Sequence, residues 1–261
     1  MNNIEVKGLR KSFMSRGQRL QVLDGIDFRI DGGSFVCILG PSGSGKSVTL
    51  HIIAGLLSKD EGSVFLGDSD IAVSGKPQLA FVFQSPRLLP WKSVENNIKY
   101  VLKGLGQTRQ EMDDVVHRVL EKMDLVHFKK YYPHQISGGM QQRVALARAL
   151  ALESDIILMD EPFSSLDEIT AIALREELIQ IWQDTQKTIA FVTHNIAEAC
   201  YLADKIVMLT PKPTQVYAEI NINLPRPRDF GGEQLFEYEK DVFRRFETCL
   251  VESKSRKEDF I

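Results

Sequence analysis

The chain has 261 residues, of which 43% are hydrophobic and 26% are charged, a composition typical of an ordinary soluble globular protein. Its formal net charge of −3 gives no overall field suited to binding nucleic acid or a strongly anionic membrane surface. No run of residues approaches the ~18 apolar positions that a membrane span needs, and we expect no signal peptide. The three cysteines have no metal-binding spacing and are expected to be reduced, structural thiols. Any work at a membrane would therefore be done through a partner.

The first third of the chain predicts strands around one glycine-rich loop. Residues 4–9 and 19–30 alternate apolar and polar positions, which indicates antiparallel strands with one solvated face. Residues 34–40 read as a buried strand that leads into the glycine loop, and residues 47–57 have helical spacing. Residues 61–71 and 78–84 again have the pattern of strands.

The middle of the chain, from about residue 86 to 152, has the three-four apolar spacing of helices, at residues 94–105, 109–125 and 138–152. Strand patterns return at residues 155–162, 188–194 and 205–211, with a helix at 173–186 between the first two. Strands that alternate with helices predict an α/β fold with a parallel, doubly wound sheet. The helical middle is therefore interpreted as a subdomain inserted into a domain of residues 1–230. That domain would begin with an antiparallel β subdomain at its N-terminus.

Residues 231–261 form a predicted C-terminal helical tail. Its apolar stripe comprises Leu235, Tyr238, Val242, Phe246 and Cys249. The stripe is most simply a face that packs on the protein's own body, and the polar residues after 250 are expected to fray.

The segment GPSGSGKS matches the phosphate-loop pattern G-x-x-x-x-G-K-[ST] between a predicted strand and a predicted helix. Glycines let successive backbone amides point at phosphate oxygens, and the helix start adds its positive end. Lys46 would reach the β- and γ-phosphates, and the Ser47 hydroxyl would bind magnesium. Val48 offers only its backbone amide to the α-phosphate. The predicted nucleotide-binding residues of this loop are Gly40, Pro41, Ser42, Gly43, Ser44, Gly45, Lys46, Ser47 and Val48.

Three polar residues follow predicted buried strands and are candidates for catalysis. Asp160 and Glu161 end the run IILM, where two acids are costly unless they serve a charged ligand. Asp160 would hold the hydration shell of magnesium, and Glu161 would polarise the attacking water or accept its proton. His194 ends a further strand, and that position favours a role near the γ-phosphate over the structural role that a lone histidine more often has.

A second helix start, Ser137-Gly138-Gly139, is also suited to an anion, because a helix N-terminus attracts negative charge. Together with the glycine loop, Gln84, LMDEP, SSLD and TH, the segment SGGMQ resembles the ATP-binding cassette (ABC) ATPases over nearly the whole chain. The resemblance implies that Ser137, Gly138, Gly139, Met140 and Gln141 close over the γ-phosphate held by a second copy, in a head-to-tail dimer. Ile136 and Met140 depart from the commoner leucine and glutamine.

The same resemblance implies roles for other residues. Gln84 would join the magnesium shell to the helical insertion and is taken as catalytic with Glu161 and His194. Phe13 would stack on adenine, with a plain core aromatic as the alternative. The dimer-contacting loop would run from Ser164 to Asp167. The implied cofactors are ATP and Mg²⁺.

Two segments, residues 85–97 and 223–230, resemble the importer branch for nitrate, sulfonates and taurine. The resemblance implies a peripheral subunit at the cytoplasmic face of the inner membrane, working with transmembrane permease subunits and, indirectly, a solute-binding protein. The predicted permease contact is Arg87, Leu88, Leu89, Pro90 and Trp91; burial of Trp91 within the insertion is the alternative. A soluble ABC ATPase acting on an assembly or repair scaffold stays open as a second function. A kinase or GTPase with the same glycine loop would have no use for SGGMQ.

Overall fold

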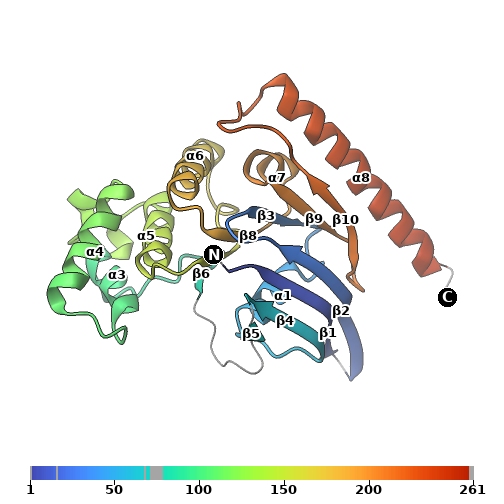
Figure 1. The fold of residues 1–261 in the computed structure, drawn as a ribbon, viewed down its shortest axis with the longest axis horizontal. Coiled ribbons are helices and arrows are strands. Elements are labelled where there is room, and N and C mark those ends of the chain that lie inside the picture. Colours follow the sequence, from blue (N-terminus) through green and yellow to red (C-terminus); the bar gives the residue numbers. More distant parts are fainter. Residues whose placement is uncertain (1, 16, 68, 71–78, 259–261) are drawn as a thin grey trace. The chain divides into compact units, whose positions relative to one another are not determined.

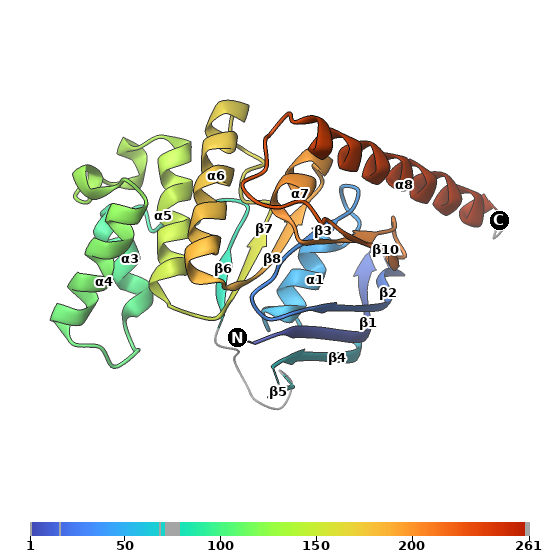
Figure 2. The same cartoon turned by 45° about the horizontal axis from the view of Figure 1, so that its top comes forward.

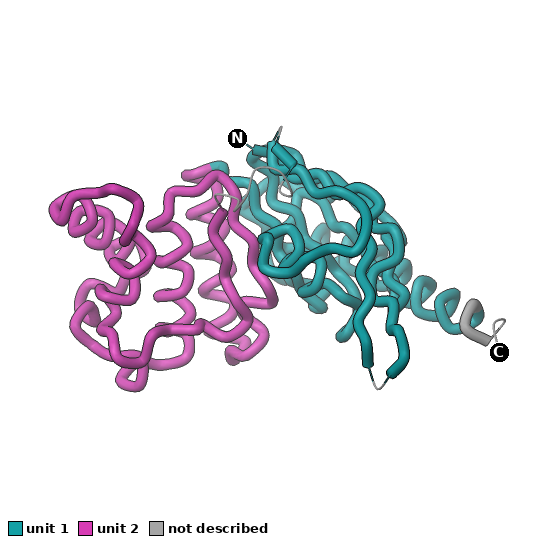
Figure 3. Tube along the Cα trace, turned by 90° about the horizontal axis from the view of Figure 1, so that it is seen from below, with its two compact units in different colours: residues 1–77, 186–261 teal, residues 78–185 magenta. Residues whose placement is uncertain are grey.

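The computed structural model describes residues 2–15, 17–67, 69–70 and 79–258, so Gln78 and the end of the predicted 61–71 strand lie outside the described residues. The chain divides into two compact units, residues 1–77 with 186–261, and residues 78–185 (Figure 3). Each unit contains strands and helices of its own (Figure 1).

The first unit carries an antiparallel sheet with strand order β2-β1-β4-β5. Its strands are β1 (Ile4–Ser15), β2 (Gln18–Ile30), β4 (Glu61–Leu66) and β5 (Ser69–Asp70). Ile4 and Val6 are buried, as their alternation predicts, and Leu9 is buried after a register shift between Val6 and Leu9. β1 runs six residues beyond the predicted strand, because its pairing with β2 continues through Phe13 and Leu20 to Ser15 and Gln18.

The same unit holds the parallel strands that position the glycine loop. β3 (Phe35–Leu39) lies between β8 (Thr188–Thr193) and β9 (Lys205–Leu209), parallel to both, and β10 (Val216–Asn221) pairs antiparallel with β9. Every residue of β3 and β8 is buried, which explains why both read as continuous apolar runs. Figures 1 and 2 show α1 (Lys46–Ile53) on one side of these strands and α7 (Ile196–Leu202) on the other. Neither α7 nor β10 was predicted from the sequence.

The second unit contains two parallel strands and most of the helices. The strands are β6 (Ala80–Val82) and β7 (Ile156–Asp160). The helices are α3 (Val94–Leu102), α4 (Arg109–Lys122), α5 (Gly138–Ala151) and α6 (Glu168–Thr185), with short 3₁₀ turns at Val126–Phe128 and Pro133–Gln135. α5 packs against α3, α4, α6 and β6. The insertion boundaries of about 86 and 152 stay a prediction.

The C-terminal helix α8 (Glu233–Glu258) packs on α7, with Leu235, Val242 and Cys249 buried along one stripe. This confirms the predicted contact of the tail with the body. The expectation of fraying after residue 250 is wrong for residues 251–258, since the helix continues to Glu258, and residues 259–261 lie outside the described residues. Mixed charges suit this polar stretch to a solvated helix.

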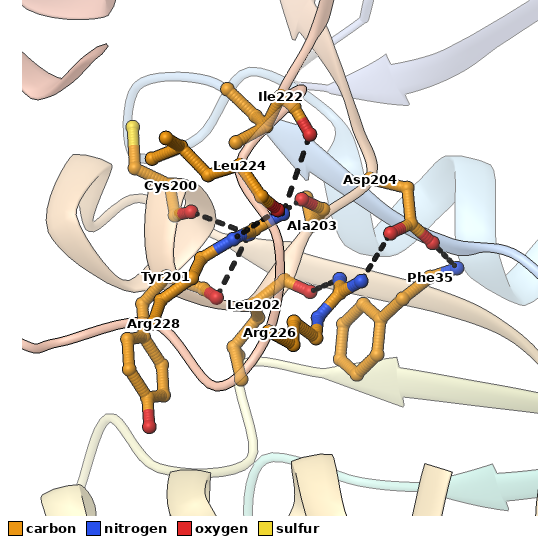
Figure 4. A network of polar contacts seen from close by, with 10 residues as sticks. All are labelled: Phe35, Cys200, Tyr201, Leu202, Ala203, Asp204, Ile222, Leu224, Arg226 and Arg228. Atoms are coloured by element: carbon orange, nitrogen blue, oxygen red, sulfur yellow. Dashed lines mark hydrogen bonds and ion pairs between the residues drawn. The ribbon is translucent and has the colours of Figure 1, made fainter. Parts of the chain in front are cut away.

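The segment before α8 is held by a buried arginine (Figure 4). Arg228 is 8% exposed, and its Nη1 donates to the carbonyls of Cys200, Tyr201 and Ala203 at 2.8–2.9 Å. These carbonyls end α7, where a helix has no intrahelical donors left. Burial is the largest cause that lowers the pKa of the Arg228 guanidinium, to about 10. Part of the predicted branch segment 223–230 therefore has a structural role.

Candidate functional site

The glycine loop between β3 and α1 has the backbone that phosphate binding requires. Gly43 and Gly45 have φ values of +76° and +94°, a region that disfavours side chains. A Cβ on Gly45 would lie 2.8 Å from Leu23 and 2.9 Å from Val22, whereas a Cβ on Gly43 would meet nothing within 4 Å. Gly45 therefore serves close packing as well as the turn, and Gly43 borders open space.

The N-terminus of α1 is suited to an anion. Gly45, which has no side chain to form a capping hydrogen bond, is its N-cap, and the first turn contains no acidic residue. The Lys46 side chain is buried, with Nζ 2.9 Å from the Gly40 carbonyl and 3.1 Å from the Pro41 carbonyl. The ammonium is thus folded over its own loop, where the helix dipole and the backbone amides favour a phosphate. Ser47 and Val48 are half-buried in the same turn.

His194 follows β8 and is exposed. Its backbone is held on both sides, because the Thr193 hydroxyl accepts from the Asn195 amide at 2.9 Å and donates to the buried Glu198 carboxylate at 2.5 Å. Sequence reasoning missed Glu198. Its signal was an acid four residues after the histidine, in the first turn of a helix that was not predicted.

Phe13 lies on β1, 37% exposed, with Lys11 Nζ 5.5 Å from its ring centroid. The alternative of a plain core aromatic is therefore wrong. Its stacking on adenine stays a prediction.

The acidic pair lies at the end of β7 in the second unit. Asp160 is 7% exposed, and Glu161 has a φ of +44°, a strained backbone for a residue with a side chain. The Ser164 hydroxyl donates to the Glu161 carbonyl at 3.0 Å and accepts from Gln84 Nε2 at 3.1 Å. The structure thus brings Gln84, Ser164 and Glu161 into one hydrogen-bonded chain. Strained backbone of this kind is concentrated at functional sites.

The next residues of the same loop begin α6. Asp167 Oδ1 accepts a hydrogen bond from the Thr170 amide at 3.0 Å. This backbone bond is the largest cause that lowers the pKa of Asp167, and a hydrogen bond from the Thr170 side chain is the next. Asp167 therefore stabilises the helix start. Its contact with a second subunit stays a prediction.

The two glycines at the start of α5 have different surroundings. Ser137 is the N-cap, and its hydroxyl oxygen accepts from the Met140 amide at 3.2 Å, which leaves the hydroxyl hydrogen able to donate. Gly138 is exposed, and a Cβ there would reach only Leu166, at 4.0 Å. Gly139 is buried, and a Cβ there would lie 2.6 Å from Thr170 Cγ2. Gly138 therefore borders open space, while Gly139 lets α5 and α6 approach.

Gln141 does not point outward from this helix start. Its Nε2 donates to the carbonyls of Pro133 at 3.0 Å and Ile136 at 3.4 Å. The side chain therefore braces the segment that leads into Ser137.

The segment of residues 86–92, here named the docking loop after the predicted permease contact, is held by hydrogen bonds to Asn97. This residue is fully buried; its Oδ1 accepts from the Leu89 amide at 2.8 Å, and its Nδ2 faces the carbonyls of Leu89, Lys92 and Ser93 at 3.0–3.2 Å. Trp91 is 71% exposed, so its burial within the insertion is wrong. Arg87 and Pro90 are exposed, and Leu88 and Leu89 are half-buried.

The candidate site residues therefore fall in two groups. The first unit holds Phe13, the glycine loop and His194; the second holds Gln84, the docking loop, Ser137–Gln141, Asp160, Glu161, Ser164 and Asp167. No helix in the described ranges has the length and apolarity needed to cross a bilayer.

Comparison with known proteins identifies the family. Residues 23–164 match the ABC transporter family. A relative from Bacillus cereus, named Aliphatic sulfonates import ATP-binding protein SsuB, is 41% identical over 94% of this chain and 96% of that protein. The Nitrate import ATP-binding protein NrtD of Synechocystis is 35% identical over 92% of this chain and 90% of that protein.

A solved structure, described as a dimeric post-hydrolysis state of the ATP-binding cassette MJ0796 bound to ADP and Pi, matches with a TM-score of 0.74 at 29% identity. The match covers 85% of this chain and 100% of that one. It confirms the predicted α/β fold with parallel and antiparallel sheets. The chain belongs to the ABC transporter family, as one of its ATP-hydrolysing domains.

Proposed function

We propose that this chain is the ATP-hydrolysing subunit of an importer, and that two copies close head to tail around ATP. In each composite site, one copy supplies the glycine loop, Glu161 and His194, and the other supplies the start of α5. Closure of the dimer switches a separate permease, and hydrolysis of the γ-phosphate reopens the dimer.

One observation carries this proposal: α5 presents an exposed, capped N-terminus with open space at Gly138. The Ser137 hydroxyl hydrogen and the amides of the first turn suit a γ-phosphate that arrives from outside the chain. The dimeric state of the similar MJ0796 cassette supports a dimer.

The residues also fit a magnesium ion. Ser47 at the first turn of α1, Asp160 at the end of β7 and Gln84 offer the hard oxygen donors that Mg²⁺ prefers, and a nucleotide supplies phosphate oxygens. When bound, the ion neutralises charge on the β- and γ-phosphates. Lys46 and the loop amides hold the phosphates, Glu161 orients the attacking water, and His194 contacts the γ-phosphate.

The names of the relatives support a class of solute and a kind of partner. Proteins named for sulfonate and nitrate import share at least 35% identity with this chain over at least 92% of its length. We therefore assign nitrate, a sulfonate, taurine or a related small solute, with uptake through permease subunits and a solute-binding protein. The chain would lie at the cytoplasmic face of the inner membrane, with the docking loop against the permease. These names favour transport over a role on a non-membrane scaffold.

A substitution of the catalytic carboxylate tests the ATPase half of the proposal. Glu161→Gln should bind ATP, lose about 100-fold or more in turnover, and accumulate as a dimer in sedimentation with ATP. Lys46→Ala should not dimerise with ATP. Unchanged turnover in Glu161→Gln would remove Glu161 from the catalytic machinery.

Growth of a deletion strain tests the transport half. Complementation with the wild-type gene should restore growth on an alkanesulfonate or taurine as the sole sulfur source, or on nitrate as the sole nitrogen source, and Lys46→Ala should not. Trp91→Glu should fail in growth and yet keep ATP binding. Normal growth of Trp91→Glu would contradict docking through this loop.

A further inference from the structure

A side chain near the end of α5 holds the docking loop. Arg148 lies in the last turn of α5; its Nη1 donates to the Arg87 carbonyl at 3.0 Å and its Nη2 to the Pro86 carbonyl at 2.5 Å. The two bonds use the two prongs of one planar guanidinium, a fork that lysine cannot reproduce. Within the described residues, no carboxylate forms an ion pair with Arg148. The charged guanidinium therefore makes its polar contacts with these two carbonyls.

The backbone that Arg148 holds has an unusual conformation. Arg87 has a φ of +45°, and its guanidinium carbon lies 3.9 Å from the ring centroid of Phe83. A left-handed residue with a long side chain persists only where its surroundings impose it. The fork from Arg148 and the stacking on Phe83 impose it here. Asn97 then holds the other end of the loop at Leu89 and Lys92.

The opposite end of the same helix carries the residues that are predicted to close over the γ-phosphate held by a second copy. α5 runs from Gly138 to Ala151 with Ser137 as its N-cap, so it spans about 20 Å at the usual helical rise. Its interior is buried against α3, α4 and α6. One packed helix therefore joins the residues that would meet a partner's nucleotide to the residue that fixes the docking loop.

We propose that Arg148 is a positioning residue that couples nucleotide-driven dimer closure to the docking loop. When the start of α5 shifts on contact with the γ-phosphate of the opposite copy, the helix moves as one piece and the Arg148 fork moves residues 86 and 87 with it. Without the fork, the loop still has its Asn97 clamp to α3 but loses its tie to α5. This inference rests on the proposed head-to-tail closure.

Tryptophan fluorescence tests the coupling in the whole chain. The sequence has two tryptophans, so Trp182→Phe leaves Trp91, on the docking loop, as the reporter. In a Glu161→Gln background, ATP should shift the Trp91 emission as the dimer forms. Arg148→Met should reduce that shift by about fivefold or more, with ATP affinity and dimerisation by sedimentation unchanged. Arg148→Lys has a single ammonium nitrogen in place of the two guanidinium nitrogens, and should therefore give an intermediate shift of the Trp91 emission.

A matched control lies on the same helix. Arg143 Nη1 donates to the Met123 carbonyl at 3.2 Å and its Nη2 lies 3.5 Å from Glu177 Oε2, so Arg143→Met removes arginine contacts of the same helix that do not reach the docking loop. It should leave the Trp91 shift intact. The coupling is refuted if Arg148→Met behaves like Arg143→Met, or if the unsubstituted background dimerises with no change at Trp91. If the Glu161→Gln background itself did not dimerise with ATP, that result would contradict the proposed function, and the coupling would fall with it.

Discussion

Substitution of Gly139 by alanine should destabilise the protein through a clash between two helices. The added Cβ would lie 2.6 Å from Thr170 Cγ2, about 1 Å closer than van der Waals contact permits. Overpacking of this kind costs about 1–3 kcal/mol, and replacing glycine within a helix returns about 1 kcal/mol at most. We therefore expect the free energy of unfolding to fall by about 1–2 kcal/mol, measured as the shift of the urea midpoint.

Two further variants isolate the cause. Thr170→Ser removes Cγ2 and keeps the hydroxyl, so Gly139→Ala/Thr170→Ser should regain most of the loss in a double-mutant cycle. Gly138→Ala, whose Cβ would meet only Leu166 at 4.0 Å, should keep the wild-type midpoint and lose ATP hydrolysis, because the methyl group would occupy the space that we propose for the γ-phosphate. Equal destabilisation by the two glycine substitutions, or no rescue by Thr170→Ser, would refute the packing argument.

Three other predictions concern the composite site and the fold. A mixture of Lys46→Ala and Ser137→Arg chains should regain ATPase activity that neither has alone, because one of the two composite sites is intact; no gain over the separate chains would count against the head-to-tail arrangement. Arg228→Met leaves the α7 carbonyls without donors and should lower the free energy of unfolding by about 3 kcal/mol, seen in the urea midpoint; an unchanged midpoint would contradict the capping role. The Lys11 ammonium, 2.7 Å from Asp60 Oδ1, is the largest cause that lowers the pKa of that carboxyl. Wild type should therefore be more stable than Asp60→Asn at pH 7, with the difference shrinking as the pH falls through the folded pKa of Asp60; a difference that grows on acidification would reverse the sign.

The sequence alone predicted most of the strands and the long helices, because their periodicity is local. β3, β7 and β8 read as buried runs, and α3, α4 and α5 as amphipathic helices, each close to its observed bounds. The short α7 and β10 were not predicted, since a few residues carry too little periodic signal. The fold of the tail beyond residue 250 was underestimated for a related reason, because polar residues suit a solvated helix as well as a frayed end.

The candidate site divides in the same way. Motif spacing predicted roles for Lys46, Glu161 and Ser137, since each belongs to a short pattern whose residue types suit a phosphate or its attacking water. Spacing could not show that Gly139 packs against Thr170, or that Arg148 donates to backbone sixty residues earlier in the chain. Such contacts depend on which helices meet and leave no local trace in residue order. The sequence by itself thus determined that the chain is an ATP-hydrolysing domain, because the motifs are local. Only the tertiary structure decided which residues support the segments that carry these motifs, because those contacts join positions far apart in the chain.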